Sequence, residues 1–439
     1  MNLVRKIWSS GSGGKLAVIV GTFLVVLVAV YQFAVWSLSR RLDALLEADR
    51  RAGLPTTIAE AYGPEAPQGE NAEGPLLAAA VIAESLHRQV MREMFGNDRL
   101  YPSRHDVKFA LQLGRLANAS APFGESVADA ERRRRLAFTT RPLDVREQTR
   151  RFADAFAFLL QAEAARAFHE MNVGDRDAAL NRLNRLYRLA RLGYGASPSY
   201  EWWNIVNNVI RDKVHWTIDQ VLISGAISDQ SRCALDEALA LAEDNVRSAA
   251  RAHQGQKLFA MNNYELLGGA PGSVPAWAWV RPIDLRIRVE IAETASNFAP
   301  RESESGKDAL ARRRLFMKDR AKSYKSTLYR SLLSPALVAT EDLTISGVTP
   351  FREIAHARCL RVLNALQRHK GAVADVSKLG LPPEVIIDPF TEEPLRVIKT
   401  KTGWVVYSVG EDQKELAPEE VSKGRYVVGK VEELPGRKK

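Results

Sequence analysis

The histidines, which most often carry acid–base or metal chemistry, form no recognisable motif in this sequence. They are His87, His105, His169, His215, His253, His356 and His369. His169 and Glu170 begin like the zinc helix of metalloproteases, but the second histidine four residues after the first is missing. Nucleophile-elbow, phosphate-loop and dinucleotide-binding sequences are also absent, so acyl, phosphoryl and hydride transfer lack their usual signatures.

Paired carboxylates are the remaining candidates for general acid–base catalysis. The pairs are Glu60 with Glu65 and Asp212 with Asp219. Acidic pairs of this kind are common on protein surfaces, where they only carry charge. We therefore expect no catalytic and no cofactor-binding residue, and a binding role rather than an enzymatic one.

A break rich in glycine and proline, residues 268–282, contains Trp277 and Trp279. A loop of this kind either binds a partner or connects two helices, with its tryptophans folded back on them. The first reading makes Trp277 and Trp279 a candidate partner loop. A pocket formed with His253 would make the protein an extracytoplasmic hydrolase, which stays open as an alternative.

The chain has two cysteines, Cys233 and Cys359, far apart in sequence. Whether they pair is open, because the sequence does not show that their Cα atoms come within about 7 Å. We expect two unpaired, buried thiols. Without a CxxC or Cys/His cluster, the sequence also gives no support for a structural zinc site.

The composition is that of a folded protein, with 46% hydrophobic and 26% charged residues and a formal net charge of +10. Such a charge suits an anionic partner such as lipid headgroups, an acidic wall polymer or nucleic acid. However, the basic runs Arg132–Arg135 and Arg312–Arg314 lie in predicted helices, where consecutive residues point in different directions. We expect solvated helix surfaces and no nucleic acid.

The run from Leu16 to Leu38 is uncharged and long enough to cross a bilayer as a helix. It is longer than the apolar part of a signal peptide, and Trp36 occupies the best cleavage region. Basic residues without acids precede it, which favours a cytoplasmic amino terminus. We predict a basic tail over 1–15, a transmembrane helix over 16–38, and an extracytoplasmic remainder at the bacterial inner membrane.

The segment after the predicted anchor divides into a stalk and linker, 39–74, and a helical domain, 75–340. Apolar residues at helical spacing predict helices over 152–171 and 177–192, joined at Gly174, and another around Trp202 and Trp203. Ser228 is the predicted N-cap of the helix that follows. No fixed repeat is evident, which favours an irregular bundle over a solenoid.

The start of the stalk resembles a group of membrane-anchored, uncharacterised proteins common in planctomycete-type bacteria. The matching residues are Arg50, Gly53, Pro55, Thr57, Tyr62, Pro64, Glu70, Asn71 and Ala72. The resemblance implies an extracytoplasmic protein without implying an activity.

Residues 350–430 differ in kind and predict a small α+β cap, followed by a flexible tail over 431–439. A helix is expected from Phe351 to His369. Alternating apolar residues around Val397 and Val406, with a turn at 401–403, then predict an antiparallel hairpin. The expected fold is therefore mainly α, with a single anchor helix and this cap.

The cap resembles the carboxy-terminal part of the major pseudopilin of type II secretion. The matching residues are Asp388, Pro389, Phe390, Pro394, Tyr407, Ser408, Gly410 and Asp412, with one extra residue before Pro394. Pseudopilins bind calcium in the loop that follows, which makes Asp412 a candidate ligand here. The continuation differs, with Glu411, Glu415, Glu419 and Glu420 as the only substitutes. We expect no cofactor, with calcium as the alternative.

The amino terminus departs from the pseudopilin pattern, because no acidic residue follows Gly14 in the apolar run. We therefore expect a membrane-anchored binding or scaffold protein with an envelope partner. An accessory component of a type II secretion or pilus-like system is the alternative that the resemblance implies.

Overall fold

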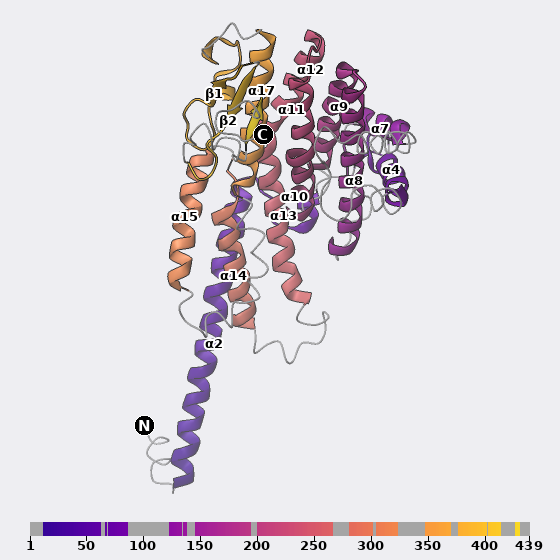
Figure 1. Ribbon diagram of the computed structural model, residues 1–439. Helices are drawn as coiled ribbons and strands as arrows, with labels where there is room; N and C mark the ends of the chain where they lie inside the picture. Colours follow the sequence, from indigo (N-terminus) through magenta and orange to yellow (C-terminus); the bar gives the residue numbers. More distant parts are fainter. Residues whose placement is uncertain are drawn as a thin grey trace.

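The computed structural model describes residues 12–62, 66–67, 69–86, 123–133, 135–137, 145–194, 200–266, 281–301, 304–323, 347–369, 376–401, 403–413 and 426–430. These residues are mainly helical, with one small sheet near the carboxyl end. A helical body carries one long helix that projects from it (Figure 1). The mainly α prediction is confirmed.

The projecting helix, α2 (Ser12–Arg51), is long and apolar enough to cross a membrane. Its 36-residue candidate span, Leu16–Arg51, reaches a mean hydropathy of 2.5 over its most apolar window, and none of that window is buried in the protein. Large apolar side chains such as Leu16, Val25 and Phe33 are more than 60% exposed. Such a surface is compatible with a single-pass anchor.

The helical body is built from helices of irregular length. They are α3 (Ile58–Tyr62), α4 (Glu73–Leu86), α7 (Phe123–Arg132), α8 (Val145–Asn172), α9 (Arg176–Tyr194), α10 (Tyr200–Val209), α11 (His215–Ile223), α12 (Asp229–Ala240), α13 (Asn245–Leu266), α14 (Arg281–Phe298), α15 (Gly306–Ser323) and α17 (Thr349–Arg368). Short turns are a π-helical turn η2 (Ile210–Val214) between α10 and α11, and the 3-10 turns η3 (Leu241–Asp244), η5 (Val376–Lys378) and η6 (Pro383–Ile386).

Local signals explain several of these boundaries. Gly174 has a φ of +98° between α8 and α9, a conformation that glycine adopts at little steric cost, so the predicted helical hairpin forms there. The Ser228 side chain accepts a hydrogen bond from the Ser231 backbone N–H, which confirms the predicted N-cap of α12.

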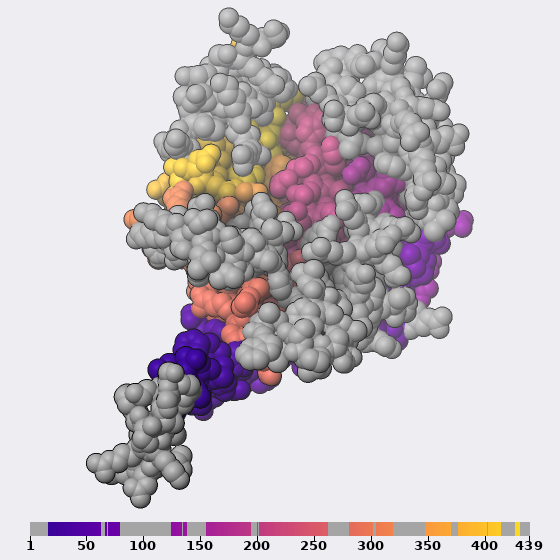
Figure 2. Space-filling model, turned by 90° about the horizontal axis from the view of Figure 1, so that it is seen from below, coloured from indigo at the N-terminus to yellow at the C-terminus, as the bar shows by residue number. Residues whose placement is uncertain are grey.

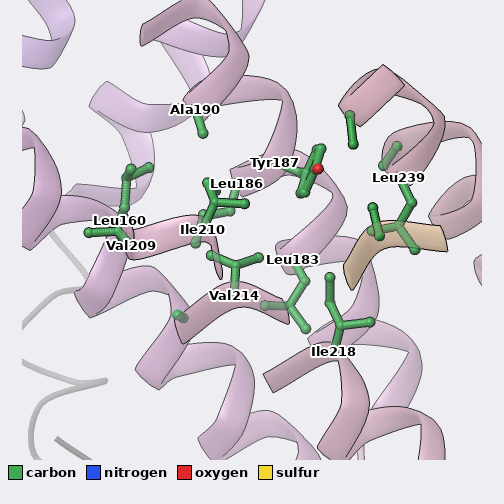
Figure 3. Packing of buried hydrophobic residues seen from close by; sticks show 14 of the residues in the cluster. Leu160, Leu183, Leu186, Tyr187, Ala190, Val209, Ile210, Val214, Ile218 and Leu239 are labelled. Carbon is green, nitrogen blue, oxygen red and sulfur yellow. The ribbon is translucent and has the colours of Figure 1, made fainter. Parts of the chain in front are cut away.

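Helices α8 through α12 share one apolar core with α17 and the sheet. Leu183, Leu186 and Tyr187 of α9 meet Val214 and Ile218 in its centre (Figure 3). Trp202 and Trp203 are fully buried in the same core. Because α17 and the sheet contribute to this cluster, the cap is continuous with the helical body.

The sheet has three antiparallel strands in the order β1 (Arg396–Lys399), β2 (Trp404–Tyr407) and β3 (Val427–Gly429). Val397 pairs with Val406, which confirms the predicted hairpin, and Val406 pairs with Val428 of a strand that the sequence pattern did not predict. Gly429 has a φ of +106°, and a Cβ there would lie 2.0 Å from the Trp404 carbonyl oxygen. Only glycine fits at this crossing.

Candidate functional site

A cleft of about 590 Å³ opens between the sheet and the neighbouring helix ends. The end of α11, the start of α12, the end of α17, the β1–β2 turn and the residue after β3 form its walls. The lining residues are Leu222, Ile223, Gly225, Ala226, Ile227, Asp229, Arg232, Leu366, Gln367, Arg368, Lys399, Thr400, Lys401, Gly403, Trp404 and Lys430. The sheet, α12 and α17 gather at the end of the body away from the amino terminus (Figure 1).

Five cationic side chains and one carboxylate line this cationic cleft. The cations are Arg232, Arg368, Lys399, Lys401 and Lys430, and the acid is Asp229. Arg368 approaches Asp229 only to 3.8 Å, and both side chains are more than half exposed. That pair neutralises little of the local charge. The cleft therefore keeps a surplus of positive charge.

At the wall formed by α12 and α17, the cation Arg232 is buried and held by hydrogen bonds. Arg232 is 7% exposed and donates to Asn364 Oδ1 at 3.0 Å and to Gln367 Oε1 at 3.2 Å. Both acceptors are neutral, and burial lowers the pKa of Arg232 below its usual value. These bonds fix the guanidinium without cancelling its charge.

The sheet brings the three lysines to one of its ends, where β1 ends, the β1–β2 turn lies and β3 ends. The Lys399 ammonium lies 5.6 Å from the centre of the Trp404 ring, a cation–π contact. The Lys430 backbone N–H donates to the Trp404 carbonyl, and its side-chain stem passes over Gly403. Lys401 is exposed in the turn. Neither Lys401 nor Lys430 has an ion-pair partner among the residues that the structure describes.

The cleft is not evident in the sequence, because its cations come from separate elements rather than from a basic run along one helix. The described arginines of the runs 132–135 and 312–314 instead bind partners outside the cleft, and Arg313 and Arg314 contact Glu411. Arg132 and Arg133 bond to Asp129, and Arg312 bonds to Glu304 and to the backbone carbonyls of Asn297 and Ala299. The only local signal for the cleft was the pair Lys399 and Lys401 beside the predicted turn.

The pseudopilin-like residues have structural roles in this chain. Asp388 is 2% exposed and accepts hydrogen bonds from the backbone N–H groups of Phe390 and Val409, both at 2.9 Å. Ser408 Oγ accepts from the Gly410 N–H, and Pro394 forms a bridge with Ile387. Phe390 and Tyr407 are buried, and the Pro389 carbonyl accepts from the Lys307 N–H. The motif thus ties the turn before β1 to the end of β2.

The candidate calcium ligands do not form a cluster where they are described. Asp412 is exposed, and the neighbouring Glu411 binds Arg352 through both carboxylate oxygens. No group of three or more His, Cys, Asp or Glu residues suited to a metal is present in the described ranges. Glu415, Glu419 and Glu420 lie outside them.

The candidate partner loop, with Trp277 and Trp279, also lies outside the described residues. His253 is fully buried, its Nε2 lies 2.7 Å from the Ala295 carbonyl oxygen, and burial lowers its pKa to about 4. This histidine acts in helix packing.

The carboxylate pairs do not converge where they are described. Glu60 caps the turn at Thr56 and Thr57, while Glu65 lies outside the described residues. Asp212 pairs with Arg211, whereas Asp219 accepts the Gly429 N–H at 2.7 Å.

Both cysteines are unpaired, as expected. Cys359 is buried in α17, where burial raises its pKa well above the ordinary value. The expectation of two buried thiols is wrong for Cys233, which is exposed because it lies on the outer face of α12.

A buried polar cluster lies where α17 meets α9, α10 and α13, and we call it the Glu353 cluster. Glu353 is fully buried and accepts from Tyr187 Oη at 3.0 Å, Tyr194 Oη at 3.1 Å and Asn245 Nδ2. Burial raises its pKa to about 7 despite these donors. Its side chain is 0% exposed and bonded by three donors from neighbouring helices, so we assign it to the joint between these helices.

Two histidines that are distant in sequence meet beside this cluster. The rings of His215 and His356 lie 4.7 Å apart, centre to centre, in an edge contact, and burial lowers both pKa values, that of His356 to about 4. Both ring nitrogens of His215 lack a hydrogen-bond partner in the described structure. His215 and His356 are thus far apart in the sequence but adjacent in the fold.

No family model, no curated protein and no solved structure matches this chain. A function for this chain is therefore inferred from the geometry of the described residues.

Proposed function

We propose that this protein is a single-pass membrane protein whose extracytoplasmic helical body binds an anionic ligand in the cationic cleft, with no catalytic role. The observation that carries the proposal is the composition of the cleft, which has five cationic side chains facing a single carboxylate. The exposed apolar surface of α2 supports the membrane anchor. Basic residues before the span, without acids, support a cytoplasmic amino terminus at the bacterial inner membrane.

The cations suit a ligand with more than one negative group. Arginine offers a planar fork for phosphate or carboxylate oxygens, and lysine adds a mobile point charge. Arg232 is held in place by Asn364 and Gln367, while Lys401 is exposed and free to adapt. A fixed guanidinium at one wall and three lysines at the other favour an elongated anion with two charged ends.

The volume also limits the ligand. A cleft of about 590 Å³ falls within the usual range for small-molecule sites, roughly 300 to 1,000 Å³. A small phosphorylated compound or a short stretch of an anionic polymer fits that space. Pyrophosphate, which carries two phosphate groups, is a simple probe of this class of ligand.

The test is calorimetric titration of pyrophosphate into the detergent-solubilised full chain at low salt. The variant Lys399→Ala/Lys401→Ala/Lys430→Ala should bind about tenfold or more weakly, since roughly 1.4 kcal/mol corresponds to tenfold in affinity. Its matched control, which removes the same number of charges, is Lys307→Ala/Lys318→Ala/Lys378→Ala, three exposed lysines outside the cleft. Raising the salt concentration should weaken wild-type binding.

Two results would contradict the proposal. Equal affinity of the wild type and the cleft variant would show that the cleft does not recognise the anion. Equal loss in the cleft variant and in the charge-matched control would show that only the overall charge of the protein matters.

A further inference from the structure

The helix that carries the predicted anchor is embedded in the body along its carboxyl half. One stripe of α2 is partly or fully buried, and it consists of Tyr31, Ala34, Val35, Leu38, Leu42, Leu45, Leu46 and Asp49. The spacing of three and four residues is that of one helical face. The neighbour along this face is α14, which lies beside α2 and runs in the same direction (Figure 1).

Three polar contacts fix how far α2 and α14 are shifted relative to each other along their axes. The Lys257 ammonium of α13 donates to Asp49 of α2 and lies 3.4 Å from Ser296 Oγ of α14. Arg41 of α2 pairs with Glu293 of α14. Asp49 and Ser296 therefore lie at nearly the same height.

The start of α14 must then lie beside the apolar run of α2. Both helices rise about 1.5 Å per residue, so equal residue counts give equal heights. Counted back from the Ser296–Asp49 level, Ile283 lies level with Trp36. Counted back from the Glu293–Arg41 pair, Ile283 lies level with Tyr31. Both positions fall inside the run from Leu16 to Leu38.

We infer that the first two turns of α14 lie in the interface of the membrane that α2 crosses, so that the body is seated on the lipid headgroups. The inference deepens the proposed function and depends on its membrane anchor. Seen from below, the surface directly beside α2 has the salmon colour of α14 and α15 (Figure 2). The occupant of this surface is the headgroup layer of the bilayer.

The side chains at this level suit that layer. Ile283 is 44% and Trp36 51% exposed, although each is a large apolar side chain. Arg281 is exposed beside Ile283, and the Arg40 guanidinium lies 4.7 Å from the centre of the Trp36 ring. Apolar and aromatic side chains mixed with arginine are typical of residues at the boundary between headgroups and acyl chains.

Contact between α14 and the membrane would also fix the orientation of the cationic cleft. Two parallel helices that are joined by the Arg41–Glu293 ion pair, and through Lys257 of α13, resist pivoting better than one flexible stalk. The body is held in one orientation, and the elements that line the cationic cleft lie at its other end (Figure 1). Its ligand then approaches from the aqueous side rather than from the anchoring bilayer.

Fluorescence quenching by spin-labelled lipids tests the depth of Ile283. The full chain with Ile283→Cys and Cys233→Ser is labelled with an environment-sensitive dye and reconstituted into vesicles of phosphatidylglycerol and phosphatidylcholine. Cys359 is buried and does not take the dye. Val25→Cys in the same background reports the centre of the span, and native Cys233, exposed on α12, reports the aqueous end.

We expect the dye at residue 283 to be quenched at least about twofold more by a shallow spin label than by a deep one, with the reverse order at residue 25 and no quenching at Cys233. Quenching at residue 25 without quenching at residue 283 would refute the seating and leave the anchor intact. A deep profile at residue 283 would also refute it. No quenching at residue 25 would overturn the anchor, and with it the membrane part of the proposed function, whereas anion binding in the cleft is tested separately by the calorimetric titration.

Discussion

Two carboxylates are buried at two joints of this molecule, and their surroundings differ. Asp49, at the joint between α2 and the body, accepts from the Lys257 ammonium and from Gln254 Nε2 at 3.0 Å. Glu353, at the joint between α17 and the helical body, accepts only from neutral hydroxyl and amide groups. The first carboxylate has a countercharge within contact distance, whereas the second has none among the residues that the structure describes.

The comparison shows that neutral hydrogen bonds do not replace a countercharge. Three donors point at Glu353, yet burial raises its pKa to about 7. The joint at α2 is thus held by paired charges, while the joint at α17 depends on protonation. Removing a partner should therefore destabilise the joint at α2, whereas raising the pH should destabilise the joint at α17.

The largest effect is expected at the charged joint. Lys257→Met leaves Asp49 buried without its partner, and an uncompensated buried charge costs about 3 to 5 kcal/mol. The Lys257 side chain is 0% exposed, so water does not replace it. The free energy of unfolding of the detergent-solubilised chain, measured with denaturant, should fall by that amount.

Two further variants test whether the loss comes from the buried, unpaired charge of Asp49. Lys257→Met/Asp49→Leu removes both charges and should recover most of the loss. Lys307→Met breaks an exposed pair with Glu392, whose side chains are 49% and 46% exposed, and should cost less than about 1 kcal/mol. Equal losses for Lys257→Met and Lys307→Met would end the distinction between the buried joint and the surface.

At the neutral joint, Glu353→Gln tests the pH dependence. The raised pKa means that the native state holds a proton that the unfolded state has released above pH 4.5. Stability from this group is complete below pH 4.5 and is lost as the pH rises through about 7. A shift of this size corresponds to about 3 kcal/mol.

Glutamine mimics the protonated acid, so wild type and Glu353→Gln should be similar at pH 5. At pH 8 the variant should be more stable by a few kcal/mol. Unfolding free energies at both pH values check this, and taking the difference between the two proteins cancels the histidine contributions. A constant difference across this range would show that Glu353 does not titrate in the native state.

The smallest of the three effects is expected from His356→Gln. Its pKa falls from 6.5 to about 4 on burial, so its stabilising contribution is present above pH 6.5 and is lost as the pH falls toward 4. The variant should lose about 1 to 2 kcal/mol less than the wild type between pH 7 and pH 5. An unchanged loss would assign the acid sensitivity to His215 or His253 instead.

Local patterns in the sequence predicted the elements that local physics determines. The apolar run of α2, the glycine at the α8–α9 turn, the N-cap at Ser228 and the alternation in β1 and β2 each depend on neighbouring residues. Strand β3 was not predicted because its three residues are stabilised by pairing with β2 rather than by their own pattern.

The sequence by itself determined the long apolar helix, the helical character of the body and the hairpin, because hydrophobic periodicity and capping act over a few residues. Only the tertiary structure decided where Lys430 meets Lys399 and Lys401, and where His215 meets His356. These residues converge because separate helices and strands pack against one core. Burial, which shifts the pKa of Glu353, likewise appears only when the whole chain has folded.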